Sequence, residues 1–94
     1  MGVEIVRVPA DWDHPVDEEG ELLEGGHHEP LYRMDDGRKT AFQLYENVSD
    51  GIPVSPVLAT REALAEWLAQ NGWSAEALEF LLANGHAPSM VKRL

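Results

Sequence analysis

The stretch from Phe42 to Leu68 constrains the fold more than any other part of this chain. Apolar and polar side chains alternate between Thr40 and Val48, which is the period of a half-buried β-strand. The prolines within residues 52–58 then keep the backbone extended, because each proline fixes its own φ and moves the preceding residue away from helical angles. Thr60 follows as a residue suited to cap a helix. A strand, an extended segment and a helix are therefore expected in that order.

Two amphipathic helices are expected between residues 60 and 85. Thr60 and Ser74 each supply a side-chain oxygen at a helix start, and an acid follows in each first turn, where the helix dipole favours an anion. Gly85 supplies the left-handed residue that commonly ends a helix. The apolar stripes are Leu64, Trp67 and Leu68, then Leu78, Leu81 and Leu82. Helices this short are marginal alone in water, so they are expected to pack together against a sheet, with Trp73 filling their junction.

The other predicted elements are strands of one small sheet. The expected strands are residues 3–8, 31–34 and 40–48, with residues 52–58 as a further extended segment. The Asp36-Gly37 pair signals a tight turn, which would join the second and third of these strands as a hairpin. The sequence therefore predicts an α+β fold for a single domain of residues 1–94, with a small antiparallel sheet of three to four strands and two short C-terminal helices packed on one face.

The segment from residue 9 to residue 30 is expected to be a long loop, because it contains glycine and proline and shows no helical or alternating period. Eight acids and no Lys or Arg lie between Asp11 and Glu29, in a chain whose net charge is −10 at pH 7. Nucleic-acid phosphates are bound through Lys and Arg, so direct nucleic-acid binding is not expected. Trp12 lies inside the acidic loop, where it would either anchor the loop or contact a partner.

Several short motifs resemble those of a family of small proteins encoded in bacteriophage genomes. The matching segments are Gln43 to Glu46, Ser49 to Val57, Leu64 to Leu68, Arg7 to Pro15, Glu29 to Tyr32 and His86 to Val91. The resemblance implies a phage as the bearer and makes an anti-CRISPR protein one alternative. Longer members of that family carry a cysteine cluster that looks like a zinc site. This chain has no cysteine, so no such site is carried over.

No residue pattern predicts catalysis or a bound cofactor, so the protein is not expected to be an enzyme. Asp11, Asp13, His14 and Asp17 offer ligand atoms for a divalent ion, but as a calcium loop they would place proline and valine at the fifth and sixth positions. The adjacent His27-His28 pair would point to opposite faces of a strand. A metal site built from these residues is therefore the weakest alternative.

The leading hypothesis is that the acidic segment binds a host protein or ribonucleoprotein complex with a basic surface, partly by electrostatic mimicry of nucleic acid. The candidate partner-binding residues are Asp11, Trp12, Asp13, Asp17, Glu18, Glu19, Glu21, Glu24 and Glu29. The alternative reading is that the negative charge only keeps the protein in solution. Another alternative is a phage interaction or assembly module, which would pair the edge from Pro53 to Leu58 with a strand of a partner. A homodimer is also possible.

The expected location is the cytoplasm of the host bacterium. The first residues do not combine a basic start with a long apolar run, as a secretory leader does. No stretch of the chain reaches the ~18 apolar residues of a membrane span, so no membrane partner is expected.

Overall fold

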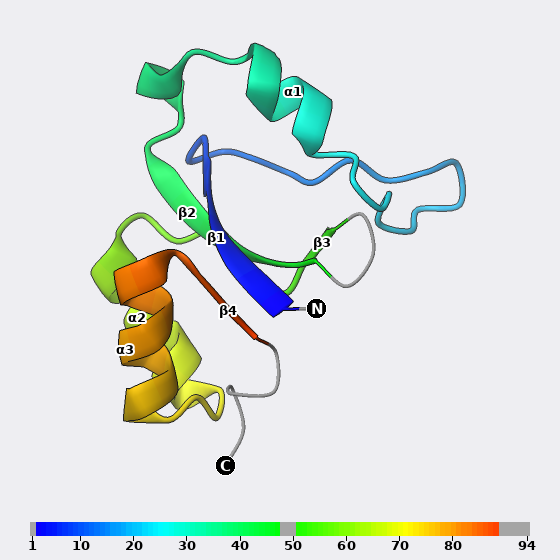
Figure 1. Cartoon of the computed structure of the whole chain (residues 1–94). Helices are drawn as coiled ribbons and strands as arrows, with labels where there is room; N and C mark the ends of the chain where they lie inside the picture. The colour runs from blue at the N-terminus through cyan, green and yellow to red at the C-terminus, as the bar shows by residue number, and fades with distance from the viewer. Residues whose placement is uncertain (1, 48–50, 89–94) are drawn as a thin grey trace.

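The chain folds into a four-stranded antiparallel sheet with two helices of the C-terminal half packed on it (Figure 1). The structure is a computed structural model, and it describes residues 2–47 and 51–88. In chain order the elements are β1 (Gly2–Val8), α1 (His28–Arg33), a 3₁₀ helix (Asp36–Arg38), β2 (Ala41–Glu46), β3 (Ile52–Pro53), α2 (Arg61–Gln70), α3 (Ala75–Asn84) and β4 (His86–Pro88). The strands lie in the order β3-β2-β1-β4. The predicted α+β class is confirmed.

The long central pair of the sheet joins β1 to β2, with Val3 opposite Glu46 and Val8 opposite Ala41. The segment after β3 continues along the other side of β2, because Leu58 exchanges two backbone hydrogen bonds of 2.8 Å with Phe42. The expectation that residues 52–58 extend the sheet is confirmed in part, since only Ile52–Pro53 forms a regular strand. Residue 48, the last of the predicted third strand, lies outside the described residues.

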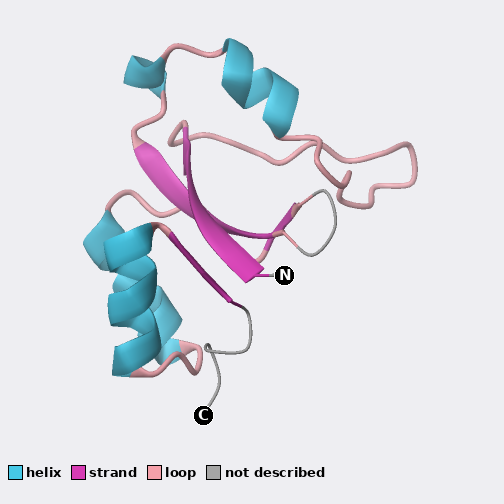
Figure 2. Cartoon of the chain, in the orientation of Figure 1, coloured by secondary structure: helices cyan, strands magenta, loops and turns pink. Residues whose placement is uncertain are grey.

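The prediction of a strand at residues 31–34 was wrong, and so was the hairpin across Gly37. Residues His28–Arg33 form the short helix α1 (Figure 2). Pro30 is tolerated there because the first turn of a helix needs no backbone N–H from it, and Glu29 pairs with Arg33 one turn later at 3.3 Å. The Asp-Gly pair belongs to the 3₁₀ helix instead of a hairpin turn, so β2 pairs with β1.

The C-terminal helices begin where the sequence predicts. The hydroxyl of Thr60 accepts a hydrogen bond of 2.9 Å from the Ala63 N–H, and the hydroxyl of Ser74 accepts one of 3.1 Å from the Ala77 N–H. Gly85 ends α3 in the left-handed conformation at φ 78°. This turn directs the chain back along the sheet as β4, a strand that the sequence analysis missed.

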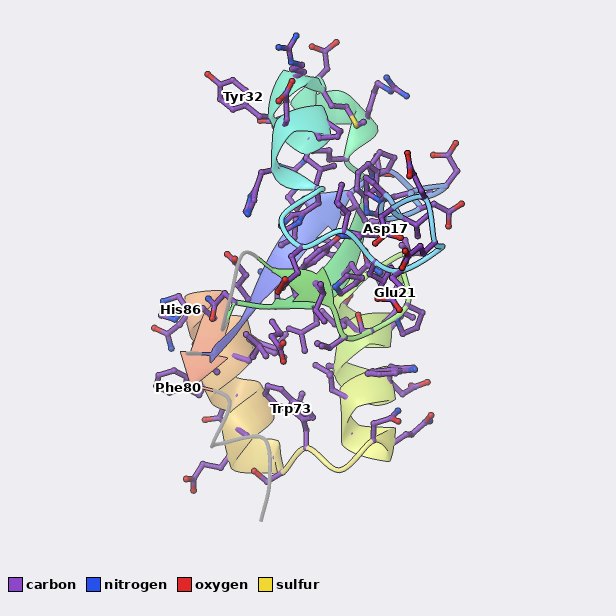
Figure 3. The ribbon with its side chains drawn as sticks, turned by 90° about the vertical axis from the view of Figure 1, so that its right-hand side faces the viewer. Asp17, Glu21, Tyr32, Trp73, Phe80 and His86 are labelled. Carbon is purple, nitrogen blue, oxygen red and sulfur yellow. The ribbon has the colours of Figure 1, made fainter. Side chains whose placement is uncertain are left out.

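The main core lies between the sheet and the two helices. Its buried side chains are Val3, Leu44, Leu64, Leu68, Trp73, Ala77, Leu81 and Ala87. Trp73 has the predicted place at the junction of α2 and α3, and Figure 3 shows its ring directed toward the interior. A smaller core of Val8, Leu31 and Ala41 lies under α1. Within residues 2–47 and 51–88, none of the helices has the length and apolar character needed to cross a bilayer.

Candidate functional site

The acidic segment between β1 and α1 is organised by its own backbone hydrogen bonds. Val16 and Leu22 form an isolated β-bridge, and between them the Asp17 N–H donates to the Glu21 carbonyl at 2.8 Å. The Asp17 carboxylate accepts hydrogen bonds from the backbone N–H groups of Glu19 at 2.9 Å and Glu21 at 3.0 Å. Gly20 completes the turn at φ 84°, a value that glycine adopts without strain. The loop therefore presents a tight, hydrogen-bonded turn at its tip.

A loop was expected from residue 9 to residue 30, but α1 begins at His28, so seven of the eight acids lie on the loop and Glu29 lies in the first turn of α1. All eight acids have exposed side chains. They are Asp11, Asp13, Asp17, Glu18, Glu19, Glu21, Glu24 and Glu29. Figure 3 shows Asp17 and Glu21 at the same end of the molecule, close to each other on the turn. Three apolar side chains are exposed among them, namely Val16 at 53%, Leu22 at 45% and Leu23 at 45%. The segment thus combines carboxylates with a small apolar patch, which is a composition suited to contacting a protein with basic and apolar groups.

Tyr45 anchors the acidic segment to the sheet. Its buried hydroxyl accepts a hydrogen bond from Trp12 Nε1 at 3.1 Å and lies 2.9 Å from Nδ1 of His14. The other nitrogen of His14, Nε2, lies 2.6 Å from the Leu23 carbonyl oxygen. Because a carbonyl only accepts, Nε2 carries the proton, and in the neutral ring Nδ1 accepts from the tyrosine hydroxyl. Trp12 is partly buried and acts as an anchor of the loop.

His27 completes this cluster from the start of α1. Its ring is buried, with its centroid 4.0 Å from those of Tyr45 and His28 and 5.5 Å from that of His14. Burial, helped by the nearby His28 and His14, lowers the pKa of His27 from 6.5 to about 4. Burial also raises the pKa of Tyr45. Nδ1 of His27 has no hydrogen-bond partner in the described part of the chain.

His14 and His27 both pack in the cluster around Tyr45. Both ring nitrogens of His14 are already engaged, so neither is available to a metal unless the anchor breaks. In the described ranges, no group of three or more His, Cys, Asp and Glu side chains is placed to hold an ion. Tyr45, the centre of the cluster, is not among the site residues predicted from the sequence. Its only sequence signal was its place in the alternating strand.

Position 51 requires glycine, because the backbone there lies close to the ring of His27. A Cβ atom at Gly51 would lie 2.9 Å from Cε1 of His27, and the backbone is at φ 109°. The Gly51 carbonyl also accepts a hydrogen bond of 2.8 Å from the Gly25 N–H. This hydrogen bond joins the end of the acidic segment to the residue before β3.

We expect Gly51→Ala to lower the free energy of unfolding by about 1 to 2 kcal/mol, because the alanine is strained at a positive φ and collides with the His27 ring. Urea unfolding followed by tryptophan fluorescence measures the change. Gly37→Ala is the matched control, since nothing in the described structure lies within 4 Å of a Cβ there and no positive φ is involved. Equal stabilities of the two variants would contradict the proposed contact.

Comparisons of the chain with protein-family models, with curated protein sequences and with solved structures gave no match.

Proposed function

We propose that this protein is a bacteriophage accessory protein that binds and inhibits a nucleic-acid-handling defence complex in the cytoplasm of the host bacterium, with a CRISPR effector as the first target to test. The observation that carries the proposal is the set of eight exposed carboxylates, of which seven lie on a loop that is tied to the sheet through Tyr45 and one, Glu29, lies in the first turn of α1. The resemblance of the chain's motifs to phage-encoded proteins supports the choice of target.

The charge of the acidic segment and its internal hydrogen bonds both favour binding to a basic channel. A basic channel that receives a nucleic acid attracts an array of carboxylates, and long-range attraction speeds the encounter. An ordered loop loses less conformational entropy on binding than a mobile one does. Val16, Leu22 and Leu23 add exposed apolar area beside the charges, which slows dissociation after the encounter.

The alternative of an assembly module that uses the Pro53 to Leu58 edge has less support. Pro53 and Pro56 lack backbone N–H groups, and the segment already pairs with β2 through Val54 and Leu58. An edge with two missing donors offers a partner strand few hydrogen bonds.

Binding to a purified CRISPR effector complex tests the proposal. The double variant Glu18→Lys/Glu19→Lys is expected to weaken binding by about tenfold or more, and the affinity of the unchanged protein is expected to fall as salt is raised. Asp17 is left intact because its carboxylate holds the turn. The control is Glu66→Lys/Glu79→Lys, which makes the same change of charge on exposed positions of α2 and α3 outside their first turns.

Two results would contradict the proposal. One is no association with the effector complex at low salt. The other is equal weakening by the two double variants, which would mean that only net charge matters and that the acidic segment is not the contact surface.

A further inference from the structure

The outer edge of β1 is only half covered. On that side β4 pairs with Gly2, Val3 and Glu4, and its register ends there. The next residue, Ile5, donates its N–H to the Gly85 carbonyl at 2.8 Å, at the turn between α3 and β4. Beyond Ile5, no strand among the described residues pairs with this edge.

The sheet register shows which way the backbone of Arg7 points. Arg7 lies opposite Phe42 in the β1–β2 pair, and both the N–H and the carbonyl of Phe42 are bonded to Leu58 on the far side of β2. Arg7 and Phe42 therefore form a pair without mutual hydrogen bonds, as alternate pairs do in an antiparallel ladder. The N–H and carbonyl of Arg7 face the uncovered edge, on the same side as the N–H of Ile5.

A groove of about 430 Å³ runs between this edge and α1. Its lining includes Ile5 and Arg7 from β1, Leu31 and Tyr32 from α1, and Lys39. Tyr32 is 89% exposed, and Figure 3 shows it projecting from α1 on the side of the molecule away from Asp17 and Glu21. His27, whose Nδ1 lacks a partner in the described part of the chain, also contributes to the wall. The groove is therefore separate from the acidic turn.

The groove gathers two of the seven basic residues of a chain whose net charge is −10 at pH 7. Arg7 and Lys39 line it together with a single acid, Glu4. The Arg7 guanidinium donates to the carbonyl oxygens of Lys39 and Asp36 at 3.0–3.2 Å, which hold it in place. It forms no ion pair within residues 2–47 and 51–88, although Lys39 pairs with Asp36 at 3.0 Å. Lys39, and after it Arg7, lower the pKa of the nearby Asp36 carboxylate, so Asp36 offsets part of the Arg7 charge. The Nη1 group of Arg7 takes part in none of these hydrogen bonds, and it can meet a carboxylate of another molecule.

We propose that this groove binds an extended, acidic peptide segment of a partner protein, which adds as a short strand to the outer edge of β1 beside Arg7. Extended backbone satisfies the free N–H and carbonyl of Arg7, and a carboxylate on the peptide pairs with its guanidinium. A second copy of β1 is a poor occupant, because symmetric pairing at this short edge would place two Arg7 side chains together. The proposal concerns a different surface from the acidic segment and does not depend on the proposed function.

The free protein provides the first test through amide hydrogen exchange measured by NMR. The Arg7 amide is expected to exchange at least about tenfold faster than the amides of Val6 and Val8, which point toward β2. Equal protection of the three amides would mean that the edge is already covered, and it would overturn the proposal.

The second test is selection from a phage-displayed library of random ten-residue peptides. Enriched peptides are expected to contain Asp or Glu among β-branched residues, to protect the Arg7 amide, and to lose about tenfold or more in affinity for Arg7→Glu. Tyr32→Ala serves as a second variant, because a side chain this exposed contributes little to folding and its loss should still weaken binding. Val16→Ala, an exposed apolar change in the acidic segment, is the control and should bind as the unchanged protein does.

Three outcomes would overturn the proposal. They are no enrichment above background, enriched peptides that bind Arg7→Glu as well as the unchanged protein, and peptides that perturb amides of the acidic turn in place of those of β1. The last outcome would assign peptide binding to the acidic segment.

Discussion

Lowering the pH from about 6.5 to about 4 is expected to remove about 3 kcal/mol of folding stability through His27 alone. The pKa of this residue is 6.5 in the unfolded chain and about 4 in the fold, so the unfolded state binds more protons between these values. The stabilising effect is fully present above pH 6.5 and is lost as the pH falls toward 4. The physical cause is burial, because a charged ring would lose its hydration in a site where it packs against Tyr45 at an interplanar angle of 33°.

Urea unfolding at a series of pH values measures this effect. Carboxylates also titrate at the acidic end of the range, so the contribution of His27 is the difference between the unchanged protein and His27→Phe, which keeps a ring but cannot bind a proton. The unfolding free energy of the unchanged protein minus that of His27→Phe should fall as the pH is lowered from about 6.5 to about 4, because only the unchanged protein carries the buried histidine. A pH-independent difference for His27→Phe would rule out the buried, neutral His27.

Tyr45→Phe is expected to lower the free energy of unfolding by about 2 kcal/mol and to loosen the acidic segment. The substitution removes the hydroxyl that bonds both Trp12 Nε1 and His14 Nδ1, and so it leaves two polar groups without partners. The phenylalanine ring keeps the apolar packing of a side chain that is fully buried. Tyr32→Phe is the matched control, because the Tyr32 side chain is 89% exposed and its hydroxyl should contribute nothing measurable.

Amide exchange separates a local effect from a global one in this experiment. The amides of Asp17 and Leu23, which are bonded within the acidic segment, should exchange faster in Tyr45→Phe than the lower global stability explains. If the exchange rates of these amides fall, or rise only as much as those of the core amides, the segment keeps its structure without the tyrosine anchor. The proposed rigid presentation of the carboxylates would then lose its structural basis.

The features that could be read from the sequence are those set by neighbouring residues. Thr60 and Ser74 cap their helices with side chains three residues from their targets, and Gly85 ends α3 because it tolerates a positive φ. The β-branched run of β1 and the alternation of β2 likewise carry their own pattern. The α+β class followed from these local signals, and so did the exposure of the acids between Asp11 and Glu29, since charged side chains avoid burial.

Tertiary structure alone decided the features that depend on residues far apart in the chain. Residues 31–34 are too few to show a period, and α1 forms there because its Leu31 packs on Val8 and Ala41. β4 has three residues and exists because Gly85 turns the chain back along β1. In the cluster around Tyr45, His14 contacts a residue 31 positions away in the sequence. The alternating pattern of β2 does not predict that a histidine packs against it. The free edge of β1 likewise follows from where β4 stops, since hydrogen bonding between strands is settled only when the strands meet.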